Sequence, residues 1–391
     1  MIYLDYNATT PIDPTVAKAM EPFLYQEFGN PSSRYPLGQR AREAVEKARG
    51  DVAQLLGCEP QEIVFTSGGS EANNMVIKGV AAAHRGRRRH IITSQIEHPS
   101  VLEPCRYLES EGVEVTYLGV DRQGRVSPGE LRDAVRPETI LVSIMHANNE
   151  VGTLQPIEEM AKIAKEAGVL FHTDAAQSVG KVPVSVRDLG VDFLTVAGHK
   201  LYAPKGVGAL YVRDGISLVS LIHGAAQERG RRAGTESALL CVGLAAACKL
   251  AKEGLEQESQ RIRGLRDSLH QGLQGCVDGL TLNGHPDERL PNTLNVSFPG
   301  VAGHQVLEEI PEMWASTGSA CHEGSGEISP VLRAMGVPEE VALGAVRLSL
   351  GRPTTREDVD RAIQMVEQWA KARAKRKGLW GRLKGLFQRS R

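Results

Sequence analysis

Residues 168–208 read GVLFHTDAAQSVGKVPVSVRDLGVDFLTVAGHKLYAPKGVG, and this stretch decides the fold class. It contains two apolar runs, the first closed by Asp174 and the second by Lys200. The segment between them is long enough to cross over a sheet, which predicts a βαβ unit with parallel strands. Neighbouring parallel strands have their carboxyl ends at the same edge of the sheet. We therefore expect Asp174 and Lys200 at this C-terminal edge, where open α/β sheets bind their ligands.

This pair of side chains has two interpretations. A structural salt bridge between the carboxylate and the amine is the simpler one. The other is a site for pyridoxal phosphate, in which the lysine forms a Schiff base with the aldehyde and the aspartate pairs with the pyridine N–H. The two residues alone leave both interpretations open, so the rest of the chain has to distinguish them.

The remainder of the chain alternates apolar, strand-like runs with amphipathic helical segments, which predicts an α/β fold with a parallel-rich sheet. A length of 391 residues favours two domains. A helical stretch from about 238 to 275 is the expected connector, and a final helix is expected near 356–372.

Composition and charge exclude several classes of protein. We find no apolar run of the ~18 residues that a membrane span needs, and MIYLDYN at the start has no features of a signal peptide, so we expect a cytoplasmic protein. The net charge of −1 is distributed unevenly along the chain. Residues 371–391 contain nine Lys and Arg and no acidic residue, so residues 1–370 carry a net charge of −10. That acidic body indicates no nucleic-acid partner.

The six cysteines are scattered and show no C-x-x-C spacing, which argues against a zinc site and a disulfide framework. We expect no metal site, and we expect most of these thiols to be small buried apolar groups. The cysteines are Cys58, Cys105, Cys241, Cys248, Cys276 and Cys321.

Several polar residues follow other predicted strands. In TSGGSEANN, Gly69 and Ser70 follow a strand and open a helix, a suitable site for a phosphate, although a plain capped turn has the same pattern. His98 in EHPS could stack on a flat cofactor and move protons, or be structural. Asn149 in HANNE could bond a ring hydroxyl or form a local turn, and Gln177 follows Asp174 by three residues.

Two later residues suggest what such a site would do. Cys321 lies in STGSACHEGSGEISP, a run with few apolar residues, so we expect an exposed, reactive thiol on a mobile loop rather than an incidental surface group. Arg347 lies in the strand-like AVRLSLG. A buried strand arginine needs an anion, which a substrate carboxylate or a salt bridge at a domain interface would supply.

Together these motifs resemble those of the cysteine desulfurases, the NifS- and IscS-like branch of the class V aminotransferases, which are fold-type I pyridoxal phosphate enzymes. The similarity runs from YLDYNATTP to RLSLGRPTT, roughly residues 1–370. It implies a large domain (16–260) with a seven-stranded, parallel-rich sheet. It also implies a smaller α+β domain (1–15 and 261–370) that carries the mobile Cys321 loop.

The resemblance also implies a role for each matching residue. It attaches the cofactor to Lys200, pairs the pyridine nitrogen with Asp174, and stacks His98 on the ring as an acid and base. The other cofactor contacts fall to Gly69, Ser70, Asn149, Gln177, His199 and, across a homodimer, Thr235. The substrate contacts fall to Asn7, Asn149 and Arg347, and Cys321 is the residue that accepts the sulfur.

The implied reaction converts L-cysteine to L-alanine and leaves a persulfide on Cys321 for iron–sulfur cluster or thio-cofactor assembly. Nine residues between Cys321 and VLRAMG resemble the long-loop branch, which passes sulfur to scaffold proteins. Two alternatives stay open. One is a selenocysteine lyase or another fold-type I lyase or aminotransferase, and the other is a catalytically weakened dimeric scaffold or regulator.

The chain departs from the family pattern at five alanines. Four of them replace a serine or a glycine of the GHK, PKG and QERG motifs, and the fifth removes a hydroxyl beside Thr235. The lost hydroxyls and stiffened loop suggest weaker phosphate binding or a narrower set of partners. The positions are Ala197, Ala203, Ala225, Ala226 and Ala233.

Residues 371–391 form a basic tail with apolar residues at helical spacing. This pattern is typical of an amphipathic helix that binds an anionic membrane surface or a partner's groove. A frayed, solvated end is the alternative, because three glycines weaken an isolated helix.

Overall fold

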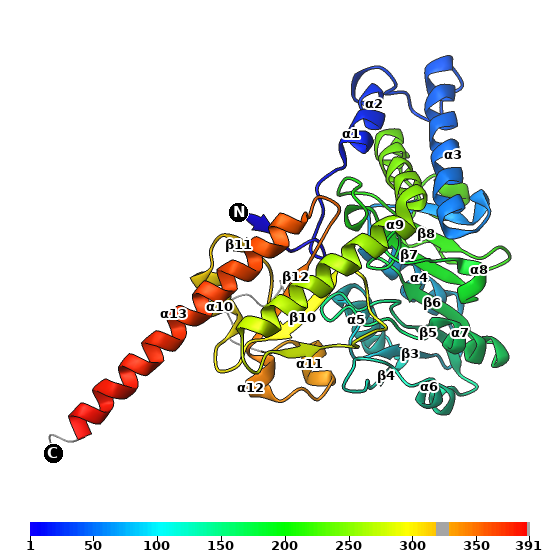
Figure 1. Ribbon diagram of the computed structural model, residues 1–391. Helices are drawn as coiled ribbons and strands as arrows, with labels where there is room; N and C mark the ends of the chain where they lie inside the picture. The colour runs from blue at the N-terminus through cyan, green and yellow to red at the C-terminus, as the bar shows by residue number, and fades with distance from the viewer. Residues whose placement is uncertain (318–327, 389–391) are drawn as a thin grey trace.

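The computed structural model describes residues 1–317 and 328–388, and Figure 1 shows the chain as a larger body and a smaller one joined by a long helix. The larger body holds a seven-stranded sheet in the order β2-β8-β7-β6-β5-β3-β4. All neighbours in it run parallel except β8, which is antiparallel to both β2 and β7. The strands are Ile63–Thr66 (β2), His90–Ser94 (β3), Glu114–Leu118 (β4), Thr139–Ser143 (β5), Leu170–Asp174 (β6), Phe193–Ala197 (β7) and Gly208–Val212 (β8).

The central strands confirm the expected parallel pair. β6 and β7 are parallel, with Asp174 opposite Thr195, and Lys200 closes the short 3-10 turn η2 (Gly198–Lys200) directly after β7. The crossover is less helical than expected, since its only helix is the four-residue α8 (Val186–Leu189), which ends at Gly190 in a left-handed conformation. Gly180 and Pro183 interrupt this segment and leave little room for a longer helix.

Helices cover both faces of this sheet. Apolar side chains pack on each face and form two clusters, one beneath α3, α7 and α9 and the other beneath α4 and α5. Because both faces are covered, strands β2, β3, β7 and β8 are buried along their whole length, whereas β4 at the end of the sheet is partly exposed. The helices are Pro14–Met20 (α1), Pro22–Tyr25 (α2), Pro36–Leu56 (α3), Gly69–Ala83 (α4), Pro99–Ser110 (α5), Pro128–Ala134 (α6) and Ile157–Glu166 (α7), with 3-10 turns at Pro60–Glu62 (η1) and Gln227–Gly230 (η3).

The smaller body combines distant parts of the chain. Its antiparallel sheet has the order β12-β10-β9, and a separate parallel pair joins β1 near the N-terminus to β11. A bridge between Asp5 and Ser349 brings the first residues of the chain alongside β12. The elements are Ile2–Tyr3 (β1), Thr281–Asn283 (β9), Thr293–Ser297 (β10), Gly303–Glu309 (α10), Met313–Trp314 (β11), Pro330–Ala334 (α11), Glu339–Ala342 (α12) and Ala345–Ser349 (β12).

Helix α9 (Ala238–Cys276) connects the two bodies, as expected from the sequence. Its first part contributes to the core under the seven-stranded sheet, and its last part contributes Ile262, Leu265 and Leu269 to a second core. The expected division of the chain at 260 falls between these two parts of the helix.

The last helix is longer than the sequence suggested. α13 runs from Arg356 to Gln388, past the expected end near 372 and through most of the basic tail, and Figure 1 shows it projecting from the smaller body. No proline interrupts 373–388, and lysine, arginine, leucine and alanine favour a helix strongly enough to offset three glycines. Among the described residues, no helix is both long enough and apolar enough to cross a membrane.

Candidate active site

Lys200 makes no ion pair with Asp174, so the salt-bridge interpretation of the two residues is wrong. Its ammonium Nζ instead donates to two main-chain oxygens, those of Asn7 and of Ala8, the latter at 2.8 Å. Burial lowers the pKa of this lysine to about 8, assisted by the positive charge of Arg347 and opposed by Asp5 and Asp174. A large fraction of the amines is therefore neutral near pH 8, as a nucleophilic lysine requires.

Asp174 is held as an acceptor at the end of β6. Its Oδ1 accepts the main-chain N–H of Ala176 at 2.9 Å, and its Oδ2 accepts the side-chain amide of Asn73 at 2.8 Å. The carboxylate is 7% exposed, so its orientation is fixed by these two bonds. Asn73 was missed in the sequence, although it follows Gly69 by one helical turn in α4 and therefore shares its face.

The turn between β2 and α4 matches the pattern expected of an anion site. Gly68 precedes the helix with φ +150°, and Gly69 and Ser70 form its first turn. A Cβ placed on Gly69 would lie 3.4 Å from the Cβ of Ala197, so the start of α4 and the end of β7 lie side by side. The free main-chain N–H groups of a helix start, next to the turn that carries Lys200, suit a phosphate.

Two histidines lie beside this turn. His98 caps α5, and its ring nitrogen Nδ1 lies 2.8 Å from Ser100 Oγ and accepts the Ser100 main-chain N–H at 3.1 Å. Although solvent reaches the ring, desolvation by the surrounding protein lowers the pKa of His98, and Asp174 and Lys200 act on it in opposite directions. His199 lies 3.2 Å from Thr9 Oγ1, and mainly burial lowers its pKa to about 4. Both rings are thus mainly neutral at neutral pH. Because His98 Nδ1 accepts the Ser100 N–H, the neutral His98 ring carries its proton on Nε2.

Asn7 connects the parts of the site. Its main-chain oxygen accepts Lys200 Nζ and, at 3.0 Å, Gln177 Nε2. Its side-chain oxygen accepts Lys181 Nζ at 3.4 Å, and its side-chain amide donates to the main-chain oxygen of Asn149 at 3.1 Å. Asn7 is 1% exposed, so these bonds fix the N-terminal segment against the edge of the large sheet.

Arg347 lies on β12 with its guanidinium buried, as the sequence predicted. Its Nη2 pairs with Asp5 Oδ1 at 2.6 Å, and its Nη1 donates to the Asn149 main-chain oxygen at 3.0 Å. Its Nε is buried and has no hydrogen-bond partner in residues 1–317 and 328–388. Both expectations for this residue therefore apply in part. A salt bridge exists, and one donor remains for a further anion.

The structure says less about the roles of three other predicted residues, Asn149, Thr235 and Cys321. Asn149 lies six residues beyond the end of β5, in a loop rather than at the strand end. Thr235 is exposed in the loop that precedes α9. Cys321 and its expected mobile loop lie outside the described residues.

The five cysteines of the described residues are poor nucleophiles. Cys105, Cys241 and Cys248 are buried, and Cys58 and Cys276 are half-buried. Burial raises the pKa of every one of these thiols, to about 12 for Cys58, Cys105 and Cys248. None of the five is a thiolate at neutral pH.

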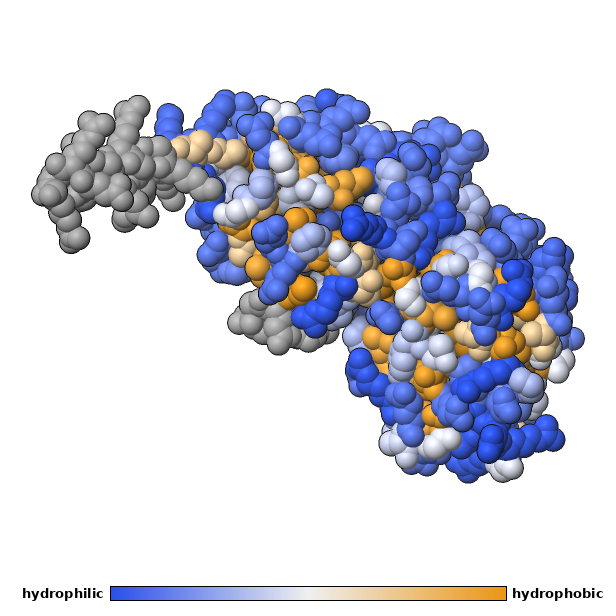
Figure 2. Space-filling view, turned by 90° about the horizontal axis from the view of Figure 1, so that it is seen from below, coloured by the Kyte–Doolittle hydropathy of each residue, from blue (hydrophilic) through white to orange (hydrophobic). Residues whose placement is uncertain are grey.

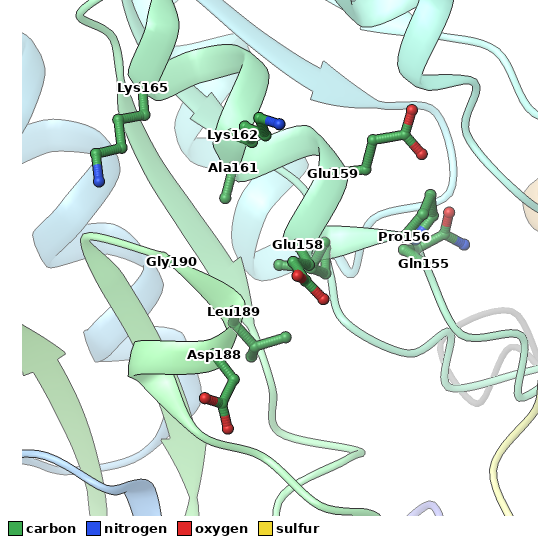
Figure 3. Close-up of a pocket in the computed structure, with 11 residues that line it drawn as sticks. Gln155, Pro156, Glu158, Glu159, Ala161, Lys162, Lys165, Asp188, Leu189 and Gly190 are labelled. Carbon is green, nitrogen blue, oxygen red and sulfur yellow. The ribbon is translucent and has the colours of Figure 1, made fainter.

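A surface pocket of about 670 Å³ lies between α7 and α8 and includes none of the predicted site residues. Figure 3 shows side chains of both charges lining it, the carboxylates of Glu158, Glu159 and Asp188 and the amines of Lys162 and Lys165. This mixture of charges selects no ligand, so the residues around Asn7 remain the candidate site.

The aminotransferase class-V family matches residues 2–362, more than nine-tenths of the chain. The chain belongs to the class-V aminotransferase family. Cysteine desulfurase IscS of Dictyoglomus turgidum is 49% identical over 369 residues, which cover 94% of each protein. The resemblance to cysteine desulfurases, stated above from the motifs, is therefore confirmed.

Solved structures agree with the family assignment. A NifS-like protein superposes with a TM-score of 0.89 and 40% identity, covering 95% of this chain and 99% of that one. SspA in complex with cysteine superposes with a TM-score of 0.81 and 40% identity, covering 90% and 99%. The predicted α/β fold with a seven-stranded, parallel-rich sheet is confirmed.

Proposed function

We propose that the chain removes sulfur from L-cysteine with pyridoxal phosphate bound at Lys200, and passes that sulfur to Cys321. L-Cysteine and the Cys321 thiol give L-alanine and a Cys321 persulfide. The substrate's carbon–sulfur bond breaks, a sulfur–sulfur bond forms, and a proton is added to the carbon that the sulfur leaves. The observation that carries the proposal is Lys200, a half-buried amine of lowered pKa at the sheet edge beside Asp174, which makes no ion pair with any carboxylate of the described residues.

The donors and acceptors around Lys200 fit pyridoxal phosphate. The amine would attach the aldehyde, Asp174 would accept the pyridine N–H, and the start of α4 would hold the phosphate. Gln177 has one amide hydrogen left after its bond to Asn7, and this hydrogen would be donated to an oxygen of the cofactor ring. When bound, the cofactor acts as an electron sink that weakens bonds at the substrate's α carbon.

Substrate recognition falls to the N-terminal segment and β12. Arg347 has an unpartnered Nε and would bind the substrate carboxylate, while Asp5 keeps the guanidinium oriented. His98, neutral at neutral pH with its proton on Nε2, would donate that proton at the substrate and take one back. These residues suit an amino acid substrate, and the solved structure of SspA in complex with cysteine supports cysteine as that substrate.

The chain segments on either side of the Cys321 loop are fixed to the same site. Ser316, before the loop, exchanges main-chain hydrogen bonds of 3.2 and 2.7 Å with Arg347. Ser329, after it, donates from Oγ to Glu150 Oε2 at 2.5 Å, next to Asn149. Both ends of the loop therefore start beside residues proposed to hold the substrate, which supports Cys321 as the sulfur acceptor.

A homodimer is part of the proposal. Leu24, Tyr25, Phe28 and Tyr35 are 52–78% exposed within one short stretch around α2, a density of apolar surface that a second copy would cover. Figure 2 shows apolar residues exposed in several patches on one face, among hydrophilic ones. Thr235, exposed in this chain, would then contribute to the partner's phosphate site. A protein such as an iron–sulfur scaffold would take the sulfur onward, and a cytoplasmic location stays a prediction.

The test measures both products. Purified chain loaded with pyridoxal phosphate is incubated with L-cysteine, and we expect L-alanine together with a persulfide on Cys321, mapped by mass spectrometry. Cys321→Ala should abolish persulfide and nearly all alanine release, whereas the half-buried Cys276→Ala serves as a matched control with wild-type turnover. Continued alanine release by Cys321→Ala would indicate a lyase that does not use the loop, and the absence of alanine from the wild type would overturn the proposal.

A further inference from the structure

Lys181 lies next to the candidate site but has no role in the mechanism above. It follows Gln177 by four residues, in the turn after β6. Its ammonium Nζ donates to Gln177 Oε1 at 2.9 Å and to Asn7 Oδ1 at 3.4 Å. Burial, with repulsion from Lys200 and Arg347, lowers the pKa of Lys181 to about 7.

Lys181 is a cation without a counter-ion. Both of its acceptors are neutral amide oxygens, and no Asp or Glu forms an ion pair with it in the described part of the chain. Arg347, in the same cluster, pairs with Asp5. A half-buried ammonium without an anion costs free energy, so we expect a negatively charged ligand that binds there to offset this cost.

Lys181 also decides which way the amide of Gln177 points. A lysine ammonium only donates, so Gln177 must turn its oxygen toward Lys181 and its NH₂ group the other way. One of those two hydrogens goes to the Asn7 main-chain oxygen, in common with Lys200 Nζ. Among the described residues no acceptor is found for the second hydrogen, which therefore stays available to a ligand.

We propose that Lys181 is a positioning residue of this active site, which holds the Gln177 amide as a donor to the ring oxygen of the cofactor. Its positive charge also complements that anionic oxygen and disfavours a proton on the nitrogen of Lys200. The inference rests on the proposed function, because it requires pyridoxal phosphate at Lys200. It adds a residue that positions the cofactor without touching the reacting atoms.

The charges around Lys181 give the sign of its effect. A neighbouring positive charge makes protonation of Lys200's nitrogen less favourable, so its removal should raise the pH at which that nitrogen loses its proton. Several other charged or titratable groups act on the same cluster and stay unchanged in the variants below. These groups are Arg347, Asp5, Asp174, His98 and His199.

The first experiment follows the visible absorbance of lysine-bound pyridoxal phosphate as a function of pH. We expect Lys181→Met to move the midpoint upward by about one pH unit, and Lys181→Arg, which keeps the charge, to leave it near the wild-type value. Lys205→Met, an exposed lysine of the adjacent turn, is the matched control and should not move it. A wild-type midpoint in folded Lys181→Met would overturn the inference.

The second experiment asks whether Lys181 acts through Gln177. Apo-protein is titrated with pyridoxal phosphate for Lys181→Met, Gln177→Leu and the double variant. Each single change should weaken binding about tenfold, and the double variant should lose little more. If the losses of binding free energy in the two single variants add up in the double variant, Lys181 does not act through Gln177, and the inference is overturned. A wild type that binds no pyridoxal phosphate would instead refute the proposed function, so the two failures are distinguishable.

Discussion

The edge of the seven-stranded sheet and the segment from Asp5 to Thr10 face the same site but are built differently. At the sheet edge, Asp174 ends a strand, Lys200 closes the next turn and Gly69 opens a helix, so local structure places each group. In the second region, Asp5 meets Arg347 across 342 residues of sequence. In the proposed function, the first region would supply the groups for bond-making and the second the groups for substrate recognition.

The largest effect should come from the sheet edge. Lys200→Ala removes the only amine proposed to attach the cofactor, so alanine release should fall about 10³-fold or more and the visible absorbance of lysine-bound cofactor should vanish. Lys205→Ala, exposed five residues later, is the control and should keep both. Retained absorbance in Lys200→Ala would show that another lysine binds the cofactor. The sheet edge would then not be the region that carries the chemistry.

The next effect tests the recognition region. Arg347→Lys keeps the charge but loses the planar fork, so the KM for L-cysteine should rise about 10- to 100-fold while kcat changes less. Steady-state kinetics separate the two constants, and exposed Arg356→Lys on α13 is the control. A fall in kcat with an unchanged KM would mean that Arg347 contributes to the chemical step and not to substrate binding.

A pH effect of about tenfold per unit should follow from Lys200. Burial holds its pKa near 8, so the neutral, reactive fraction rises as pH increases toward that value and is complete above it. The rate at which apo-protein takes up pyridoxal phosphate, measured by stopped-flow absorbance, should rise about tenfold per pH unit below 8 and level off beyond 9. A rate that keeps rising to pH 10 would mean that the amine is an ordinary lysine.

Stability should also depend on pH through Glu97, which is buried behind the sheet edge. Burial raises its pKa to about 8, with Ser94 and the main chain of Met145 bonded to the carboxyl group. A raised pKa means that the folded state binds the proton more tightly than the unfolded state. Stability should therefore fall from about pH 4.5 to 8, by at most about 1.4 kcal/mol per pH unit.

Urea unfolding at several pH values measures this dependence. Glu97→Gln should flatten the fall, whereas Glu103→Gln, an exposed carboxylate on α5, should leave it unchanged. If the free energy of unfolding of Glu97→Gln decreases with pH as steeply as that of the wild type, other groups cause the effect. Glu97 would then be less shielded from solvent than its contacts indicate.

The smallest effect concerns the alanines that depart from the family pattern. Ala197 lies beside Gly69 at the proposed phosphate site, and Ala233 is buried near Gly224. Ala197→Ser with Ala233→Ser should tighten pyridoxal phosphate binding about three- to tenfold, the contribution of one or two added hydrogen bonds. Equal affinities in an apo-protein titration would show that main-chain groups alone determine phosphate binding.

Much of the sheet edge could be predicted because its residues carry local signals. Apolar runs closed by Asp174 and by Lys200 predicted parallel strands that end together, and the glycines before Ser70 predicted a helix start. The length of α13 was not predicted correctly, since three glycines in the tail outweighed the helix formers around them. The small helix content of the crossover was also missed.

The sequence by itself determined the fold class, the edge of the sheet expected to bind ligands and the candidates Asp174, His98 and Lys200, because strand ends and helix starts are encoded by neighbouring residues. Only the tertiary structure decided that Asp174 and Lys200 do not pair, that Asn7 connects them to Gln177, and that Lys181 stands beside them without a counter-ion. Hydrogen bonds between residues far apart in the chain leave no periodic pattern. A buried polar group has to form a hydrogen bond with a group that the fold places next to it, so its partner depends on the tertiary structure.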